Sequence, residues 1–134
     1  MATFPLTIVC PDGVKFEGQI QQLTVRTTSG EMGILAGHIN CVCPLGMGRA
    51  TILTEGERKY AACIGGMVSV VDGKVSLVPT SFEWAEDIDV ARAQASYDRG
   101  RGILNSKGVS DKDVQLAQAR IKRALVRKSV AQGK

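Results

Sequence analysis

Short apolar runs that alternate with polar residues dominate the chain up to about residue 82. Nine runs have the alternation that favours β-strands: Leu6–Cys10, Val14–Glu17, Ile20–Thr27, Met32–Leu35, Cys41–Leu45, Gly48–Leu53, Lys59–Ile64, Met67–Val71 and Lys74–Val78. Glycine and aspartate turns separate them, and Asp72-Gly73 is the clearest hairpin turn. So many short strands at close spacing predict an antiparallel β-sandwich or a flattened barrel.

The pattern changes between Glu83 and Ala93, where alanine and arginine become frequent and the apolar period approaches four. We expect a first helix at Ile88–Leu104 with Asp87 as its N-cap. The Lys107-Gly108 pair would connect it to a second helix. We therefore expect two domains, a β-sandwich at residues 1–85 and a helical hairpin at residues 86–134.

The second helix is predicted to begin after Ser110, because Ser110 and Asp113 resemble a capping box, and to end near Ser129. Its apolar stripe consists of Val114, Ala117, Ile121 and Ala124 or Leu125. In the first helix Gly100 and Gly102 each cost ~1 kcal/mol relative to alanine. Because the contacts are small and one end is weakened, we expect the hairpin to dock weakly and to be movable.

Composition excludes several classes of protein. No basic segment followed by an apolar run begins the chain, and no apolar stretch approaches the ~18 residues of a membrane span. We therefore expect a soluble cytoplasmic protein that inserts into no membrane itself. The four cysteines, Cys10, Cys41, Cys43 and Cys63, form no C-x-x-C motif, so reduced thiols and no metal site are expected. Cys41 and Cys43 alternate and would face the same way on a strand.

No set of catalytic residues is visible. His38 is the only histidine, and its position in a glycine turn favours a turn or surface role. There is no glycine-rich phosphate loop followed by lysine. We therefore expect a protein that is not itself an enzyme and that requires no cofactor.

Charge divides the chain unevenly. Residues 1–98 carry 7 Lys and Arg against 11 Asp and Glu, a net charge of −4, whereas residues 99–134 carry 10 against 2, a net charge of +8. A basic helix can bind nucleic acid, but Tyr97 is the only aromatic residue in the predicted hairpin, which disfavours that function.

Two interpretations of the arginines stay open. Asp89 and Arg92 are three residues apart, which permits a solvated ion pair within the helix worth ~0.3 kcal/mol. Alternatively, folding of the hairpin brings Arg92 and Arg99 together with Arg123 and Arg127 from the second helix. Such a cluster would repel itself unless it bound an anion, and the guanidinium group suits phosphate.

Four segments resemble the epsilon subunit of the F-type ATP synthase. Ser29–His38 resembles the family's S/E-G-E-x-G-I-L-P-G-H segment, and Gly65–Val70 resembles its S-G-G-F-x-E-V segment. Ala85–Asp89 and Arg127–Ala131 also match. The departures are Ala36 for proline, Gly65 for serine and Met67 for phenylalanine, and they affect local turn geometry.

The resemblance implies a flattened sandwich of ten strands followed by a helical hairpin. It implies a rotor subunit, peripheral on the cytoplasmic face of the cell membrane, that contacts the gamma subunit and the c-ring, with Glu31 and His38 as rotor-contact residues. It also implies a regulatory tail that extends into the alpha/beta catalytic head and inhibits ATP hydrolysis. A free-standing sandwich module with a helical dimerisation tail is the alternative.

The same family implies ATP as a regulatory ligand. Ile88-Asp89-Val90-Ala91-Arg92-Ala93 matches fully the I/L-D-x-x-R-A motif of ATP-binding members. Four other residues resemble ATP-contacting residues by position: Glu83, Arg99, Arg123 and Arg127, although the sequence around Arg99 departs from the pattern. The resemblance thus implies that Arg92, Arg123 and Arg127 meet the phosphates, while Asp89 and Glu83 hold polar groups of the nucleotide or orient the arginines.

Overall fold

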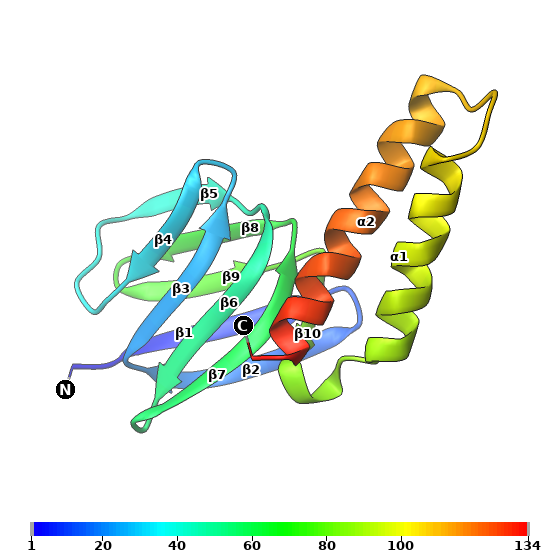
Figure 1. The fold of residues 1–134 in the computed structure, drawn as a ribbon. Coiled ribbons are helices and arrows are strands. Elements are labelled where there is room, and N and C mark those ends of the chain that lie inside the picture. Colours follow the sequence, from blue (N-terminus) through cyan, green and yellow to red (C-terminus); the bar gives the residue numbers. More distant parts are fainter. Residues whose placement is uncertain (1, 134) are drawn as a thin grey trace. The chain divides into compact units, whose positions relative to one another are not determined.

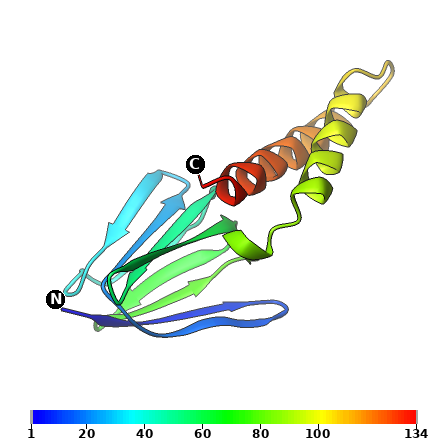
Figure 2. The ribbon, with the colours of Figure 1, turned by 60° about the horizontal axis from the view of Figure 1, so that its bottom comes forward.

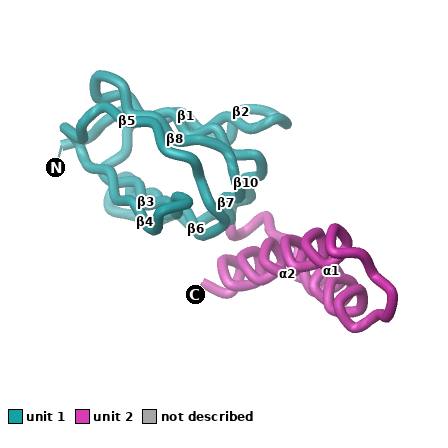
Figure 3. Tube along the Cα trace, turned by 90° about the horizontal axis from the view of Figure 1, so that it is seen from above, with its two compact units in different colours: residues 1–84 teal, residues 85–134 magenta. Residues whose placement is uncertain are grey.

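A computed structural model describes residues 2–133 of the chain (Figure 1). The strands are β1 (Phe4–Cys10), β2 (Gly13–Ile20), β3 (Gln22–Thr27), β4 (Gly30–Ile34), β5 (Cys41–Pro44), β6 (Met47–Thr54), β7 (Glu57–Ile64), β8 (Met67–Val71), β9 (Lys74–Val78) and β10 (Ser81–Trp84). The helices are a short 3₁₀ turn (Ala85–Asp87), α1 (Val90–Leu104) and α2 (Asp111–Ala131). The chain forms two compact units that divide between Trp84 and Ala85 (Figure 3).

The first unit is a sandwich of two five-stranded sheets, which confirms the predicted fold class. One sheet has the order β2-β1-β9-β8-β5 and the other β10-β7-β6-β3-β4 (Figure 2). The pairing departs from the purely antiparallel arrangement that we expected at one place, because β1 and β9 run parallel. Every other pair of neighbouring strands is antiparallel.

The core lies between the two sheets and follows the alternation in the sequence. On β1, Phe4, Leu6, Ile8 and Cys10 are buried while the residues between them are more exposed. Leu23 and Val25 of β3 are likewise fully buried. Because side chains on a strand alternate between its two faces, one apolar face per strand is enough to build this core.

The turn between β8 and β9 confirms the predicted hairpin. Val71 pairs with Lys74, and the two central residues, Asp72 and Gly73, have φ angles of 50° and 80°. Positive φ at both positions matches the right-handed twist of the flanking strands, and aspartate followed by glycine tolerates it.

Several boundaries differ from those read in the sequence. The strand-by-strand prediction missed β10, a short strand that pairs with β7. The alternation of β10 is broken off by Trp84 and the acidic turn that follows it. Strand β4 starts at Gly30, two residues before the expected start at Met32, and β7 starts at Glu57, two residues before the expected start at Lys59. In both cases ladder pairing continues further into a tight connection than composition indicates.

The first helix begins later than expected because Asp89, and not Asp87, is its N-cap. The Asp89 carboxylate accepts a hydrogen bond from the backbone N–H of Arg92 at 3.0 Å, whereas Asp87 lies in the preceding 3₁₀ turn. Both residues have the cap chemistry, so composition alone could not choose between them.

The second helix begins as predicted. The Ser110 hydroxyl accepts from the backbone N–H of Asp113 at 3.1 Å, and α2 continues two residues beyond Ser129, to Ala131. Within residues 2–133, neither helix is long and apolar enough to cross a bilayer.

Candidate functional site

The candidate anion site lies on the helical hairpin, where α1 and α2 run antiparallel (Figure 1). The residues of α1 that are buried are Ala93 and Gly100, seven positions apart and therefore on one face. Gly100 lies directly against Ala117 and Ile121 of α2. On α2, Ala117 and Ala124 are buried and again seven positions apart. These two small-residue faces form the contact between the helices.

The four arginines flank that contact on a single side. Arg92 and Arg99 each precede a buried residue of α1, which places them ~100° around the helix from the contact face. On α2, Arg123 likewise precedes the buried Ala124 and lies ~100° around the helix from it. Arg127 lies ~60° from Ala124 in the same direction of rotation. Because the helices are antiparallel, that sense of rotation points to the same side of the hairpin from both helices.

The arginines also pair by level along the hairpin axis. The contact between Gly100 and Ile121 fixes the alignment of the two helices. Counting from that contact, Arg99 lies about one residue from the level of Arg123, and Arg92 about two residues from that of Arg127, which is ~1.5–3 Å at 1.5 Å per residue. By this count the four arginines lie along one side of the hairpin, at two levels that are seven residues apart on α1.

These guanidinium groups have few internal partners. In the part of the chain that the structure describes, Arg92, Arg99 and Arg123 form no ion pair and no side-chain hydrogen bond, and Arg92 and Arg99 are exposed. The alternative of an Asp89–Arg92 ion pair is wrong, because the Asp89 carboxylate accepts the backbone N–H of Arg92 and not its guanidinium group. Three arginines on one side without an internal acid leave that side strongly positive.

The remaining residues of the I-D-x-x-R-A motif have structural roles. Ile88 is buried at the start of the hairpin, and Asp89 caps α1. Ala93 is 3% exposed on the face that contacts α2. Ile88 and Ala93 thus act on the fold of the hairpin, and the motif combines a helix start with one outward-facing arginine, Arg92.

A second contact holds the opposite side of the hairpin, which sequence reasoning missed. The Lys128 ammonium group of α2 lies 5.4 Å from the centre of the Tyr97 ring of α1. Such a cation–π contact contributes ~0.5–1 kcal/mol at an exposed site. Tyr97 is the only aromatic residue of the hairpin, and that scarcity disfavoured nucleic-acid binding. Its presence could have indicated a role in packing.

The other predicted site residues belong to the sandwich. Glu83 is half-buried in β10, so it is part of the first unit and not of the hairpin. Glu31 is exposed on β4 and lines a polar pocket of about 180 Å³ together with Gln22, Thr24, Arg49, Thr51, Leu53 and Arg58.

His38 lies in the loop between β4 and β5, which is held at its end. The His38 ring nitrogen Nδ1 is 2.8 Å from the carbonyl oxygen of Ile39. The Asn40 side-chain oxygen accepts the backbone N–H of Asp72 at 2.8 Å, which links this loop to the β8–β9 turn. Ile39 is 77% exposed, so the tip presents an apolar residue beside the histidine.

Family models match nearly the whole chain. The model described as "ATP synthase, Delta/Epsilon chain, beta-sandwich domain" matches residues 3–85, and the model described as "ATP synthase, Delta/Epsilon chain, long alpha-helix domain" matches residues 86–132. The two matches meet within one residue of the division between the compact units.

Relatives and solved structures agree with these matches. The ATP synthase epsilon chain of Bacillus cytotoxicus is 38% identical over 131 residues, with 98% of each chain covered, and that of Ruminococcus albus is 38% identical with 100% of each covered. A chain of the Euglena gracilis mitochondrial ATP synthase has the same fold, with a TM-score of 0.84, 23% identity, and coverage of 96% of this chain and 81% of that one. The chain therefore belongs to the family of ATP synthase epsilon chains.

Proposed function

We propose that this protein is the non-catalytic epsilon subunit in the central stalk of an ATP synthase, and that its hairpin binds ATP as a regulatory ligand. Family membership over both units supports the first part. It also decides against the free-standing module with a dimerisation tail, because both the sandwich and the helices match one family. The second part, ATP binding, is supported by the row of arginines on one side of the hairpin.

In this function the sandwich holds the protein on the rotor. We infer that it contacts the gamma subunit and the c-ring, at the cytoplasmic face of the cell membrane, as a peripheral subunit. The tip formed by His38 and its exposed neighbour Ile39, with Glu31 on the adjoining strand, supplies charge, a polar ring and an apolar group for the rotor contact. A solved structure with a similar fold comes from the central stalk and c-ring of the Tetrahymena thermophila enzyme, with a TM-score of 0.64 and 15% identity over 95% of each chain.

The single observation that supports ATP binding is the row of arginines on one side of the α1–α2 contact. A triphosphate carries several negative charges and suits the bidentate guanidinium groups of this row, of which Arg92, Arg99 and Arg123 form no ion pair within residues 2–133. Arg92 and Arg127 would meet the phosphates at one level, and Arg99 and Arg123 at the next. We propose that the hairpin binds ATP without hydrolysing it.

Titration of the full chain with ATP by calorimetry tests this proposal. Each charge-assisted hydrogen bond contributes ~1.5–3 kcal/mol, so Arg92→Ala should weaken binding by roughly 10- to 150-fold. Arg101→Ala is the matched control, because Arg101 follows the buried Gly100 and lies on the other side of the hairpin. Equal weakening by both substitutions would show a general charge effect and no site.

Two substitutions of Asp89 distinguish a role in capping α1 from direct contact with ATP. Asparagine caps a helix as well as aspartate does, whereas alanine costs ~1 kcal/mol. If Asp89 acts through the fold of the hairpin, Asp89→Asn should keep the ATP affinity and Asp89→Ala should lower it. If the carboxylate contacts the nucleotide directly, both substitutions should lower the affinity.

A further inference from the structure

Two cysteines lie side by side on the inner face of β5. Cys41 and Cys43 are half-buried and alternate with the exposed residues Val42 and Pro44. Both cysteines pack against the core cluster of the sandwich. Strand β5 is the edge strand of its sheet (Figures 1 and 3), so one side of it has no neighbouring strand in that sheet. The pair is thus partly enclosed by apolar groups and still reachable from solvent.

Strand geometry holds the two thiols too far apart to form a disulfide, although they are neighbours on one face of the strand. Residues two apart on a strand are ~6.6 Å apart at Cα, and their Cβ atoms point the same way. A disulfide needs a Cβ···Cβ distance of ~3.5–4.5 Å, so it cannot form here without bending the strand. Pairing of Cys41 with Val70 and of Cys43 with Val68 on β8 opposes such bending.

The two thiols nevertheless affect each other. Burial raises the pKa of the Cys41 thiol, and the neighbouring Cys43 raises it further by its charge and by a hydrogen bond. Both side chains point to the same face of β5, where they pack against the core cluster. A ligand for this place must be soft, must displace two protons and must span the gap between the sulfur atoms.

We propose that Cys41 and Cys43 together bind one Cu(I) ion. Two metal–thiolate bonds of ~2.3 Å, the length known for zinc, span up to ~4.6 Å between sulfurs, so the two side chains must turn toward each other from Cα atoms ~6.6 Å apart. Cu(I) prefers thiolates and is satisfied by two ligands in a linear arrangement. Binding releases one proton from each thiol and leaves a complex of two thiolates and one Cu(I) with a net charge of −1. No electron is transferred, because the copper arrives as Cu(I).

Zn(II) fits this place less well than Cu(I). Zn(II) takes four ligands in structural sites, and residues 2–133 contain no group of three His, Cys, Asp or Glu side chains placed to hold a metal.

The other two cysteines, Cys10 and Cys63, serve as a comparison for this pair. Cys63 is buried, which raises its pKa to about 12, and the Cys10 thiol donates to Asp12 Oδ1 at 3.0 Å.

Anaerobic titration of the reduced full chain with Cu(I), in competition with a chromophoric Cu(I) chelator, tests the proposal. We expect one Cu(I) per chain and a thiolate-to-copper absorption band in the ultraviolet. Cys41→Ser and Cys43→Ser should each weaken binding by at least ~100-fold, the upper end of what loss of an outer-sphere partner costs. Cys10→Ser and Cys63→Ala are the matched controls and should leave the affinity unchanged.

X-ray absorption at the copper edge of the wild-type complex gives an answer that depends on no variant. Two sulfur neighbours at a single distance would support the proposal, and nitrogen or oxygen neighbours would overturn it. It is equally overturned if the chelator strips all copper from the wild type, or if Cys10→Ser weakens binding as much as Cys41→Ser does.

Discussion

Gly100 of α1 lies so close to Ile121 of α2 that a Cβ atom on Gly100 would be 2.7 Å from Ile121 Cγ1 and 3.1 Å from the carbonyl oxygen of Ala117. The two helices therefore approach each other closely at this glycine. This differs from the sequence-based interpretation, in which Gly100 only weakened the end of α1. Its cost in helix propensity is offset by a contact that no larger residue permits.

Replacement of the two glycines of α1 should have opposite effects. Gly100→Ala gains ~1 kcal/mol of helix propensity but inserts a methyl group into a filled contact, which costs ~1–3 kcal/mol, so a net loss of hairpin stability is expected. A Cβ on Gly102 would meet nothing within 4 Å, so Gly102→Ala should stabilise the hairpin by up to ~1 kcal/mol.

Amide hydrogen exchange of α1 and α2 in the full chain measures both changes. Protection factors in the hairpin should fall in Gly100→Ala and rise in Gly102→Ala, while those of the sandwich core stay constant. A rise in protection in both variants would show that the contact at Gly100 adapts and that helix propensity dominates.

The two glycines show what the sequence could and could not predict. Composition places both in α1, and the hairpin itself follows from the apolar period of four and from the cap at Ser110. Which glycine faces α2 depends on the rotation of α1 about its own axis, which is set by packing against α2. That choice is made by three-dimensional packing, so the partner of Gly100 was not readable from the chain.

The same limit applies to the sandwich. Period-2 alternation identified nine strands, because each buries one face. Strand β10 (Ser81–Trp84) is short and buries Phe82 while its neighbours are only half-buried, so the alternation is too brief to stand out. The arginine cluster was predictable in outline from the spacing of Arg92 and Arg99, but the side of the hairpin that it occupies required both helices.

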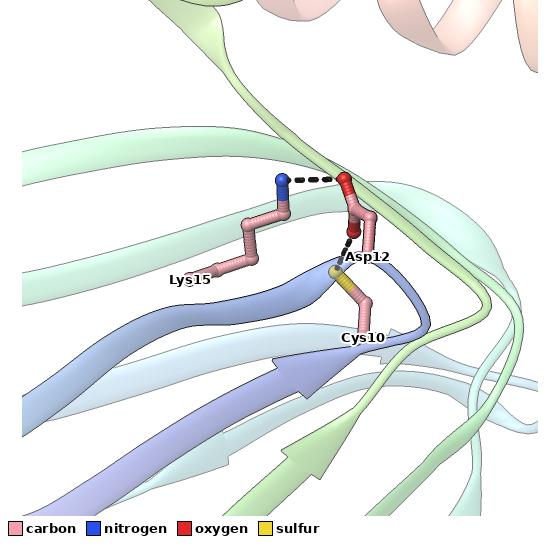
Figure 4. A network of polar contacts seen from close by, with 3 residues as sticks. All are labelled: Cys10, Asp12 and Lys15. Carbon is pink, nitrogen blue, oxygen red and sulfur yellow. Dashed lines mark hydrogen bonds and ion pairs between the residues drawn. The ribbon is translucent and has the colours of Figure 1, made fainter.

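Asp12 connects a thiol and an ammonium group at the β1–β2 turn (Figure 4). Its carboxylate accepts from the Cys10 thiol at 3.0 Å and pairs with the Lys15 ammonium group at 3.0 Å. These two partners, the thiol first, lower the pKa of Asp12 below its ordinary value of 3.8. Since the folded-state pKa is the lower one, this carboxylate favours folding above about pH 3.8, and the contribution is lost as pH falls through the lowered pKa.

Substitution of Lys15 should raise the pKa of Asp12. In Lys15→Gln the thiol remains and the ammonium group is gone, so the pKa should move part of the way back toward 3.8. NMR titration of the Asp12 carboxyl carbon measures this pKa directly, without a measurement of protein stability. Lys74→Gln, at the far end of the parallel β1–β9 pair, is the control and should leave it unchanged. If Lys15→Gln also has no effect, the ion pair is absent in solution.

The sandwich should fold without the hairpin. The members of its core cluster all precede the hairpin, and the last of them is Phe82, with Trp84 packed against the cluster. A chain that ends at Ala85 keeps all ten strands and that core. We expect dispersed amide resonances and a cooperative thermal transition for residues 1–85. Collapsed resonances and no transition would contradict the prediction and would show that the helices complete the fold.

The hairpin should inhibit ATP hydrolysis in the assembled enzyme when it opens. Arg120 to Lys128 contains 5 Lys and Arg residues and no acid, so opening exposes a strongly basic segment. Helices α1 and α2 have 15 and 21 residues, and with their connection they would extend ~60 Å as one helix at 1.5 Å per residue. We expect an extended tail of this length to enter the alpha/beta head beside the gamma subunit.

ATP bound to the hairpin should relieve this inhibition, because a ligand that binds only the folded hairpin stabilises it by ~2.7 kcal/mol at 100 times its dissociation constant. The measurement is ATP hydrolysis by the reconstituted head with the full chain or with a chain that ends at Asp87, at low and at high ATP. We expect the full chain to be the slower of the two at low ATP, and the difference to shrink at high ATP. Gly100→Ala should deepen the inhibition and Gly102→Ala should reduce it, because the first loosens the hairpin and the second tightens it. Equal hydrolysis rates for the full and shortened chains at both ATP concentrations would remove the regulatory role and leave the sandwich with its rotor contact alone.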